Sequence, residues 1–246
     1  AFASGGEVKV VEGDVNGEMQ GGVMSPGAMA IEGSDLKVNG NVSGGLVSDS
    51  STVTVNGNVT GNGIDTVIAK KGTVTVNGTV TATDLSEKTG VLASNGSNLT
   101  VGDTEVGGKE STGVIAESGS KATAGNVKVS GEYMTGTSAY GDSTVHVKGN
   151  VTADGNGMTG VSVHDGDKSS LIVDGDVTAT GENSVGIYGE TGIIKIGGDV
   201  SGREAVITKG KADVTVGGSV SGTLVGIVAG GNAAVSVKGD AGTKTG

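Results

Sequence analysis

Two histidines are the side chains in this sequence best suited to binding a transition metal. His146 in "VHVKG" and His164 in "VHDGD" lie eighteen residues apart. Imidazole nitrogens are common metal ligands, so a metal pair would form if the fold brought the two rings together. Solvated histidines without a ligand are the simpler interpretation. We therefore predict no metal site at these residues.

Aspartates offer a second kind of chemistry, because paired carboxylates at a set spacing can cut polysaccharides. Asp154, Asp174 and Asp176 are the candidates. However, Asp and Asn alternate at the position that follows a recurring glycine, namely at Asp14, Asn41, Asn58, Asn150, Asp176, Asp199 and Asp240. Both residue types favour turns, where their side chains bond to nearby backbone. We interpret them as turn residues and predict no enzymatic activity.

Calcium would require clustered oxygen ligands. The tandem glycine- and aspartate-rich nonapeptide that binds calcium in some β-solenoids does not occur here. Only loose oxygen clusters such as "DVNGE" and "DGNG" are present. The sequence predicts no cofactor, with adventitious calcium as the alternative.

The element that must position these side chains is a repeat. "STVTVNGNVT" at 51–60 returns almost unchanged as "GTVTVNGTVT" at 72–81. The shared skeleton is V-x-V-x-G-x-V, in which apolar residues alternate before and after a glycine corner. Eleven copies begin at Val8, Leu36, Val53, Val74, Leu99, Val127, Val145, Leu171, Ile194, Val214 and Val235.

The period of this repeat predicts the fold. From the corner at Gly13 to the corner at Gly239 there are 226 residues over ten intervals, or roughly 23 residues per unit. A second motif, such as "TGVLASNG", adds another short strand to each unit. Alternate residues of a strand face opposite sides, so Val53 and Val55 face inward while Thr54 faces outward. We predict an all-β parallel β-solenoid of about eleven coils with three short strands per coil.

Composition agrees with a thin interior and marks one atypical segment. The chain has 50 glycines, one phenylalanine, three tyrosines and no tryptophan, so aliphatic residues must fill the core.

Residues 1–32 differ from the rest because they hold Phe2, Pro26 and three methionines. We predict an N-terminal distorted coil, junction or cap at 1–32 and solenoid repeats at 33–246. The polar stretch "GDTEVGGKESTG" after Leu99 is expected to loop out.

Charge excludes several partners. The net charge is −11 and Arg203 is the one arginine, whereas nucleic-acid binding requires clustered basic residues. No apolar run approaches the ~20 residues of a membrane-spanning helix. We therefore expect no nucleic-acid partner and no membrane insertion.

Phrases such as "TVTVNGNVTGNG" and "LIVDGDVTATGENSVGIYGETG" resemble the coils of repeat-rich parallel β-helix surface proteins of bacteria, of the autotransporter-passenger and filamentous-haemagglutinin type. The resemblance covers nearly the whole chain. It implies a secreted or cell-surface location and a scaffold or adhesive role, with a surface glycan or a host ligand as a partner.

Two surface patterns extend this interpretation. Six N-x-S/T sequons begin at Asn41, Asn58, Asn77, Asn95, Asn98 and Asn150. They are candidate glycosylation sites, although the abundance of Asn and Thr in the repeat explains them more simply.

A predicted outward hydroxyl ladder consists of Ser43, Thr60, Thr81, Thr152, Thr178, Ser201 and Ser221. Ice-binding solenoids present such ladders. Here Met134 and Gly242 interrupt the column, and the neighbouring column is mixed and includes Lys128.

The two ends of the solenoid suggest how it could assemble. The last copy, "AVSVKGDAGTKTG", keeps the repeat pattern, so it would leave strand edges unpaired. Methionines near the other end could adapt to such a surface. We predict a non-enzymatic fibre subunit that joins head to tail through Phe2, Met19, Met24, Met29, Val235 and Val237. The alternatives are a segment of a larger surface adhesin and an ice-binding protein.

Overall fold

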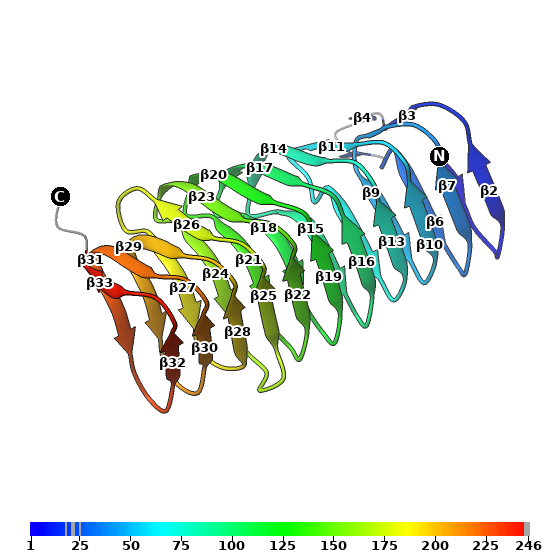
Figure 1. Cartoon of the computed structure of the whole chain (residues 1–246). Coiled ribbons are helices and arrows are strands. Elements are labelled where there is room, and N and C mark those ends of the chain that lie inside the picture. Colours follow the sequence, from blue (N-terminus) through cyan, green and yellow to red (C-terminus); the bar gives the residue numbers. More distant parts are fainter. Residues whose placement is uncertain (18, 21–22, 25, 244–246) are drawn as a thin grey trace.

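The chain winds into a parallel β-solenoid of about ten turns, each of roughly 23 residues. The structure is a computed structural model that describes residues 1–17, 19–20, 23–24 and 26–243. These residues form 33 strands and no helix. Figure 1 shows the coils stacked along one axis, with the first and the last described residues at opposite ends of the rod. The predicted fold class is confirmed.

The V-x-V strands stack into one sheet of eleven parallel strands, here called the first face. Its strands are β2 (Val8–Val11), β7 (Asp35–Val38), β10 (Thr52–Val55), β13 (Thr73–Val76), β16 (Asn98–Val101), β19 (Lys121–Ala124), β22 (Thr144–Val147), β25 (Ser170–Val173), β28 (Ile193–Ile196), β30 (Asp213–Val216) and β32 (Ala234–Val237).

The second face follows the glycine corner. Its strands are β3 (Val15–Asn16), β8 (Val42–Ser43), β11 (Val59–Asn62), β14 (Val80–Ser86), β17 (Thr104–Lys109), β20 (Val127–Glu132), β23 (Val151–Asn156), β26 (Val177–Thr180), β33 (Ala241–Thr243) and the first parts of β29 (Val200–Thr208) and β31 (Val220–Ala229).

The third face carries the second motif. Its strands are β1 (Phe2–Ala3), β6 (Ala28–Ile31), β9 (Leu46–Asp49), β12 (Val67–Lys70), β15 (Thr89–Ser94), β18 (Thr112–Ala116), β21 (Thr135–Ala139), β24 (Thr159–Val163), β27 (Val185–Gly189) and the second parts of β29 and β31. One antiparallel pair, β4 (Met19–Gln20) with β5 (Val23–Met24), belongs to none of the three faces.

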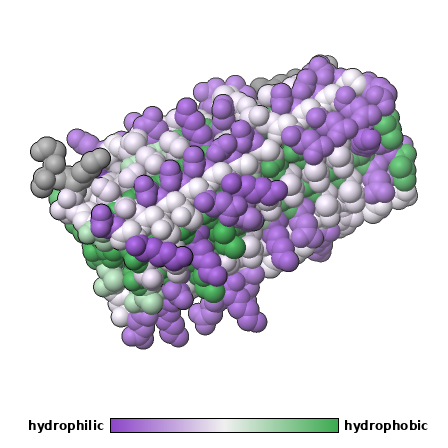
Figure 2. Space-filling model, viewed as in Figure 1, coloured by the Kyte–Doolittle hydropathy of each residue, from purple (hydrophilic) through white to green (hydrophobic). Residues whose placement is uncertain are grey.

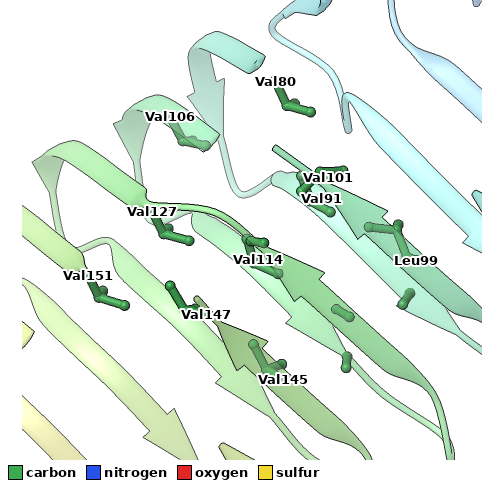
Figure 3. Packing of buried hydrophobic residues seen from close by; sticks show 14 of the residues in the cluster. Val80, Val91, Leu99, Val101, Val106, Val114, Val127, Val145, Val147 and Val151 are labelled. Atoms are coloured by element: carbon green, nitrogen blue, oxygen red, sulfur yellow. The ribbon is translucent and has the colours of Figure 1, made fainter. Parts of the chain in front are cut away.

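The core is a set of aliphatic columns inside the three faces. Val53, Val55 and Val59 are fully buried, whereas Thr52 and Thr60 on the same strands are exposed. Figure 3 shows how Val127 and Val151 repeat the same inward position in successive coils. β-Branched side chains suit this stacked surface because they pack against the same residue type above and below.

One predicted copy of the repeat is placed on the wrong face. Val127 pairs with Thr104 and Val151, so it belongs to the second face. The first-face strand of that coil is β19, whose inward residues are Ala122 and Ala124. The prediction fails because alanines replace the valines of this first-face strand, while the second-face segment "VKVSGEY" happens to fit the repeat skeleton.

The first coil is also shifted, by one residue. Lys9 lies beside Leu36 and Val11 beside Val38, so Lys9 occupies an inward position. The expected inward residues Val8 and Val10 instead face outward and are 74% and 55% exposed. Val11 lies two residues before the corner at Gly13, just as Val38 lies two residues before the corner at Gly40. This equal spacing sets the register of the first coil.

The polar stretch after Leu99 does not loop out. It forms β17 and β18, which pair with the equivalent strands of both neighbouring coils. Val106, Val114 and Ala116 supply enough buried apolar side chains to hold these strands in the stack.

Replacing Thr137 with valine should stabilise the protein. The Thr137 hydroxyl is buried and has no hydrogen-bond partner within the described structure. Val114 and Val161 occupy the same position in the adjacent coils. Removing an unpaired buried hydroxyl should raise the free energy of unfolding by about 1 to 2 kcal/mol, measured by urea denaturation.

The matched control is Thr135→Val, which makes the same change at a partly exposed position of β21. We expect its effect to stay within about 0.5 kcal/mol. Equal stability of the two variants would show that the Thr137 hydroxyl carries no penalty.

Candidate functional site

The glycine corners between the first and second faces carry a ladder of Asp and Asn side chains, which we call the corner ladder. The Asn41 Oδ1 accepts the backbone N–H of Asn58 at 2.9 Å. In later coils the Asn150 Oδ1 accepts the N–H of Asp176, and the Asp176 Oδ1 accepts the N–H of Asp199, both at 2.8 Å. Each side chain thus bonds the backbone of the next coil, which confirms that these positions act as turn residues.

The corner ladder explains the corner glycines. A Cβ at Gly175 would lie 2.0 Å from the Asn150 Oδ1, and one at Gly198 would lie 2.0 Å from the Asp176 Oδ1. Neither glycine has a positive φ. Glycine is therefore required here by the close approach of the preceding coil.

A second ladder, of buried serines, lies at the corner between the third and first faces. The Ser120 Oγ accepts the N–H groups of Gly96 and Ser97 at 3.0 and 3.2 Å. The Ser143 Oγ in turn accepts the N–H of Ser120 at 3.1 Å. The sequence analysis missed this ladder, although a small residue recurs two positions before the first inward residue of most first-face strands.

The two histidines lie on different faces with different partners. The His146 Nε2 lies 3.0 Å from the Asp174 carboxylate on the first face. His164 follows β24 on the third face, where its ring stacks on Tyr140 with the centroids 4.9 Å apart. Within the described ranges no group of three or more His, Cys, Asp or Glu side chains could hold a metal ion.

The Tyr140 and Tyr188 phenols are anchored to carboxylates beside this stack. Tyr140 donates a hydrogen bond to Glu117, and Tyr188 donates one to Glu190 at 2.6 Å. Partial burial, together with Glu117, raises the pKa of Tyr140. The hydrogen bond to Glu190 raises the pKa of Tyr188. Both phenols therefore remain protonated donors at neutral pH.

The three candidate aspartates do not share one site. Asp174 pairs with His146, whereas Asp176 belongs to the corner ladder. Asp154 accepts a hydrogen bond from the Thr180 hydroxyl. Each carboxylate thus has its own structural partner.

The predicted hydroxyl ladder does form a single column on the second face. Ser43, Thr60 and Thr81 are adjacent in register, as are Thr152, Thr178, Ser201 and Ser221. Glu105 and Lys128 separate the two groups. The expected interruption at Met134 is wrong, because Met134 is fully buried at the next corner.

The first face has two outward columns of side chains. One of them holds a longer unbroken run of threonines than predicted. Thr54, Thr75, Thr100 and Thr123 are consecutive in one column, because Thr123 takes the place expected for Lys128. The other column carries Thr52 and Thr73 but then Asn98 and Lys121. Paired threonines therefore span only two coils, Thr52 with Thr54 and Thr73 with Thr75.

All six sequon asparagines are exposed. Asn41, Asn58 and Asn150 belong to the corner ladder. The Asn77 amide donates to the Asn56 Oδ1 at 2.8 Å in a parallel ladder. Asn95 adopts a positive φ of 57° in a turn, and Asn98 opens β16.

The C-terminal end of the rod is open among the described residues. Strands β32 and β33 each pair with one neighbour, so each leaves one edge unpaired. Val235 and Val237 occupy inward positions but are only half-buried, and Leu224 and Val228 are 50% and 44% exposed. Figure 2 shows hydrophobic side chains gathered at this end.

The N-terminal end differs from the C-terminal end because a charged side chain extends across the inside of its first coil. The Lys9 ammonium donates to the Phe2 carbonyl at 2.9 Å. Phe2 lies in the edge strand β1 beside Met29, and both residues face outward from the third face. The backbones of Met19 and Met24 pair within β4 and β5, but their side chains lie outside the described residues.

No helix capable of crossing a membrane occurs in the part of the chain that the structure describes. No protein-family model matches the sequence, and neither a curated protein nor a solved structure matches it.

Proposed function

We propose that this chain is a non-enzymatic structural subunit of an extracellular or cell-surface fibre, and that copies join head to tail through their coil ends. The observation that supports the proposal most directly is the open C-terminal coil, in which Val235 and Val237 face inward and no strand of the described residues lies over them. Half-exposed core valines and unpaired strand edges are stabilised when another coil covers them. A contact between unlike ends does not close, so it gives a filament.

The repeat dictates the register of such a joint. A second copy that continues the stack would place its Val8–Val11 strand beside Ala234–Val237, with its Lys9 over Val235. The Asp240 carboxylate would then face the N–H of Asp14 in the second copy. Within one chain the Asp14 Oδ1 already accepts the equivalent N–H of Asn41 at 2.8 Å. The same corner ladder would therefore run across the joint.

The location outside the cell is part of the proposal. It rests on the resemblance of the coils to bacterial surface proteins of the autotransporter-passenger and filamentous-haemagglutinin type. A rod with many exposed hydroxyl and amide side chains and a net charge of −11 suits that role, because like charges keep neighbouring rods apart.

Lys9 should weaken the joint. It is the one charged residue at this inward position, where the other ten coils carry Leu, Val, Ile or Ala. Enclosing an ammonium group costs free energy even when its stem is covered. Lys9→Leu should therefore tighten association about tenfold, measured by sedimentation over a range of concentrations.

The control is Lys37→Leu, which removes the same charge from an exposed outward position in the next coil. We expect it to change association by less than about twofold, as is usual for isolated surface charges. Equal effects of the two variants would place the contact elsewhere than the N-terminal coil.

The proposal is tested by following particle mass against protein concentration with light scattering. Head-to-tail joining predicts a mass that rises continuously with concentration. A mass that stops at two copies would indicate a closed dimer, and a constant single-copy mass would remove the fibre proposal. An intact mass of the natural protein well above 23.6 kDa would favour a larger adhesin that contains these coils.

A further inference from the structure

A groove opens on the second face where one coil is much shorter than the coil before it. Thr178 lies beside Ser201, and Val185 lies beside Glu204. Six residues (179–184) therefore connect these positions in one coil, but only two (202–203) connect them in the next. The longer turn projects beyond the shorter one and leaves a groove of about 550 Å³.

The walls of this groove combine polar and apolar surface and carry the one arginine of the chain. Its principal side chains are those of Thr178, Asp176, Asp199, Ser201, Arg203 and Ser221. Thr178, Ser201 and Ser221 are the last part of the outward hydroxyl ladder, so they follow one another at the coil spacing of ~4.8 Å. Arg203 forms the opposite wall, where its Nη1 donates to the Asn183 Oδ1 at 3.0 Å.

Several of these groups keep hydrogen-bonding capacity for a ligand. The Asp199 Oδ1 accepts the N–H of Ser219 at 2.7 Å, and the Asp176 Oδ1 is occupied in the same way. The second oxygen of each carboxylate has no partner among the described residues, and the same is true of the Ser221 hydroxyl. The groove thus presents carboxylates that accept hydrogen bonds, a guanidinium group that donates them, and hydroxyls that can do either.

Charge and shape limit the class of ligand. Two aspartates and one arginine line the groove in a chain of net charge −11, so an anionic ligand is disfavoured. A neutral ligand rich in hydroxyl groups would use both the acceptors and the donors. The hydroxyls recur once per coil. In an extended oligosaccharide that runs along the rod, about one sugar unit would therefore contact each coil.

We propose that this groove, built from β26, β29 and the start of β31, binds a neutral oligosaccharide that runs along the rod axis. The site lies on the side of the solenoid, and the proposal is independent of how the ends associate. It assigns the strongest polar contacts to the free oxygens of Asp176 and Asp199 and to Arg203.

The test is an NMR titration of ¹⁵N-labelled protein with neutral hexasaccharides, namely maltohexaose, cellohexaose, laminarihexaose and chitohexaose. We expect saturable shifts at the groove residues with at least one of them. Ser201→Tyr should abolish binding by filling the groove, whereas Thr152→Tyr, in the same column outside the groove, should bind within about twofold of the wild type. Asp199→Asn keeps a corner-ladder oxygen but removes the charge, and should weaken binding about tenfold.

Asp103→Asn makes the same change in the same ladder, outside the groove, and should bind like the wild type. The proposal is overturned if no neutral hexasaccharide gives saturable shifts, or if Ser201→Tyr binds as well as Thr152→Tyr. A preference for a sulfated hexasaccharide over all neutral ones would overturn the assigned class of ligand.

Discussion

Replacing Gly175 with alanine is expected to lower the free energy of unfolding by about 2 to 4 kcal/mol. The new Cβ would lie 2.0 Å from the Asn150 Oδ1 and 2.9 Å from the Gly149 carbonyl oxygen. Asn150 would have to move, and its hydrogen bond to the Asp176 N–H at 2.8 Å would be lost. Both the clash and the lost bond lie at the contact between two coils, which is where a solenoid derives its stability.

Gly107→Ala is the matched control for this prediction. A Cβ at Gly107 would meet nothing closer than the Ser130 Oγ at 3.8 Å, and the backbone there has no positive φ. Urea denaturation of this variant should stay within about 0.5 kcal/mol of the wild type. If Gly175→Ala were as stable as Gly107→Ala, the corners would not be closely packed against one another.

Placing a charge on the open coil should abolish association between copies. Val237→Asp puts a carboxylate at an inward position that the joint would bury beside Val11 of the second copy, where the nearby Lys9 ammonium already donates to the Phe2 carbonyl. Because the position is already half-exposed in a single copy, the fold should tolerate the change. Association should weaken by roughly a hundredfold or more in sedimentation experiments, since a buried unpaired charge is costly.

Ser236→Asp provides the control, since it adds the same charge to the outward side of the same strand. It should weaken association far less than Val237→Asp does. Similar losses in both variants would indicate general charge repulsion, and no loss in either would show that β32 lies outside the contact.

The repeat made most of the solenoid predictable. In ten of the eleven copies the V-x-V-x-G-x-V pattern identifies the strand of the first face, because strict alternation fits only a half-buried strand. It fails at Val127, since "VKVSGEY" fits the skeleton better than "KATAGNV" does. Only the pairing of Ala122 with Leu99 and Val145 settles which segment lies on the first face.

The role of the corner residues could be predicted only in part. Alternation of Asp and Asn after most corner glycines indicated a turn, but not that these side chains bond the next coil. The requirement for glycine at Gly175 or Gly198 comes from that neighbouring side chain, so it is invisible in a single repeat. The buried serines left a clearer signal, namely the small residue that lies two positions before the first inward residue of most first-face strands.

The V-x-V-x-G-x-V repeat does not predict two features of the structure, namely the inward position of Lys9 and the groove on the second face. A slip of one residue moves every side chain of a strand to the other face, so the alternation in "VKVV" misplaces Lys9, and its register with Leu36 agrees instead with the spacing to Gly13. The 20-residue interval between Gly198 and Gly218 indicates a short coil. It does not indicate which corner is shortened, and therefore where a groove opens.

Negative-stain microscopy of the wild-type chain beside Val237→Asp tests the central claim most directly, namely that the open C-terminal coil joins one copy to the next. We expect unbranched filaments of variable length from the wild type, and rods of uniform length from the variant. Uniform single rods from both proteins at high concentration would contradict the claim, as would filaments that persist in the variant.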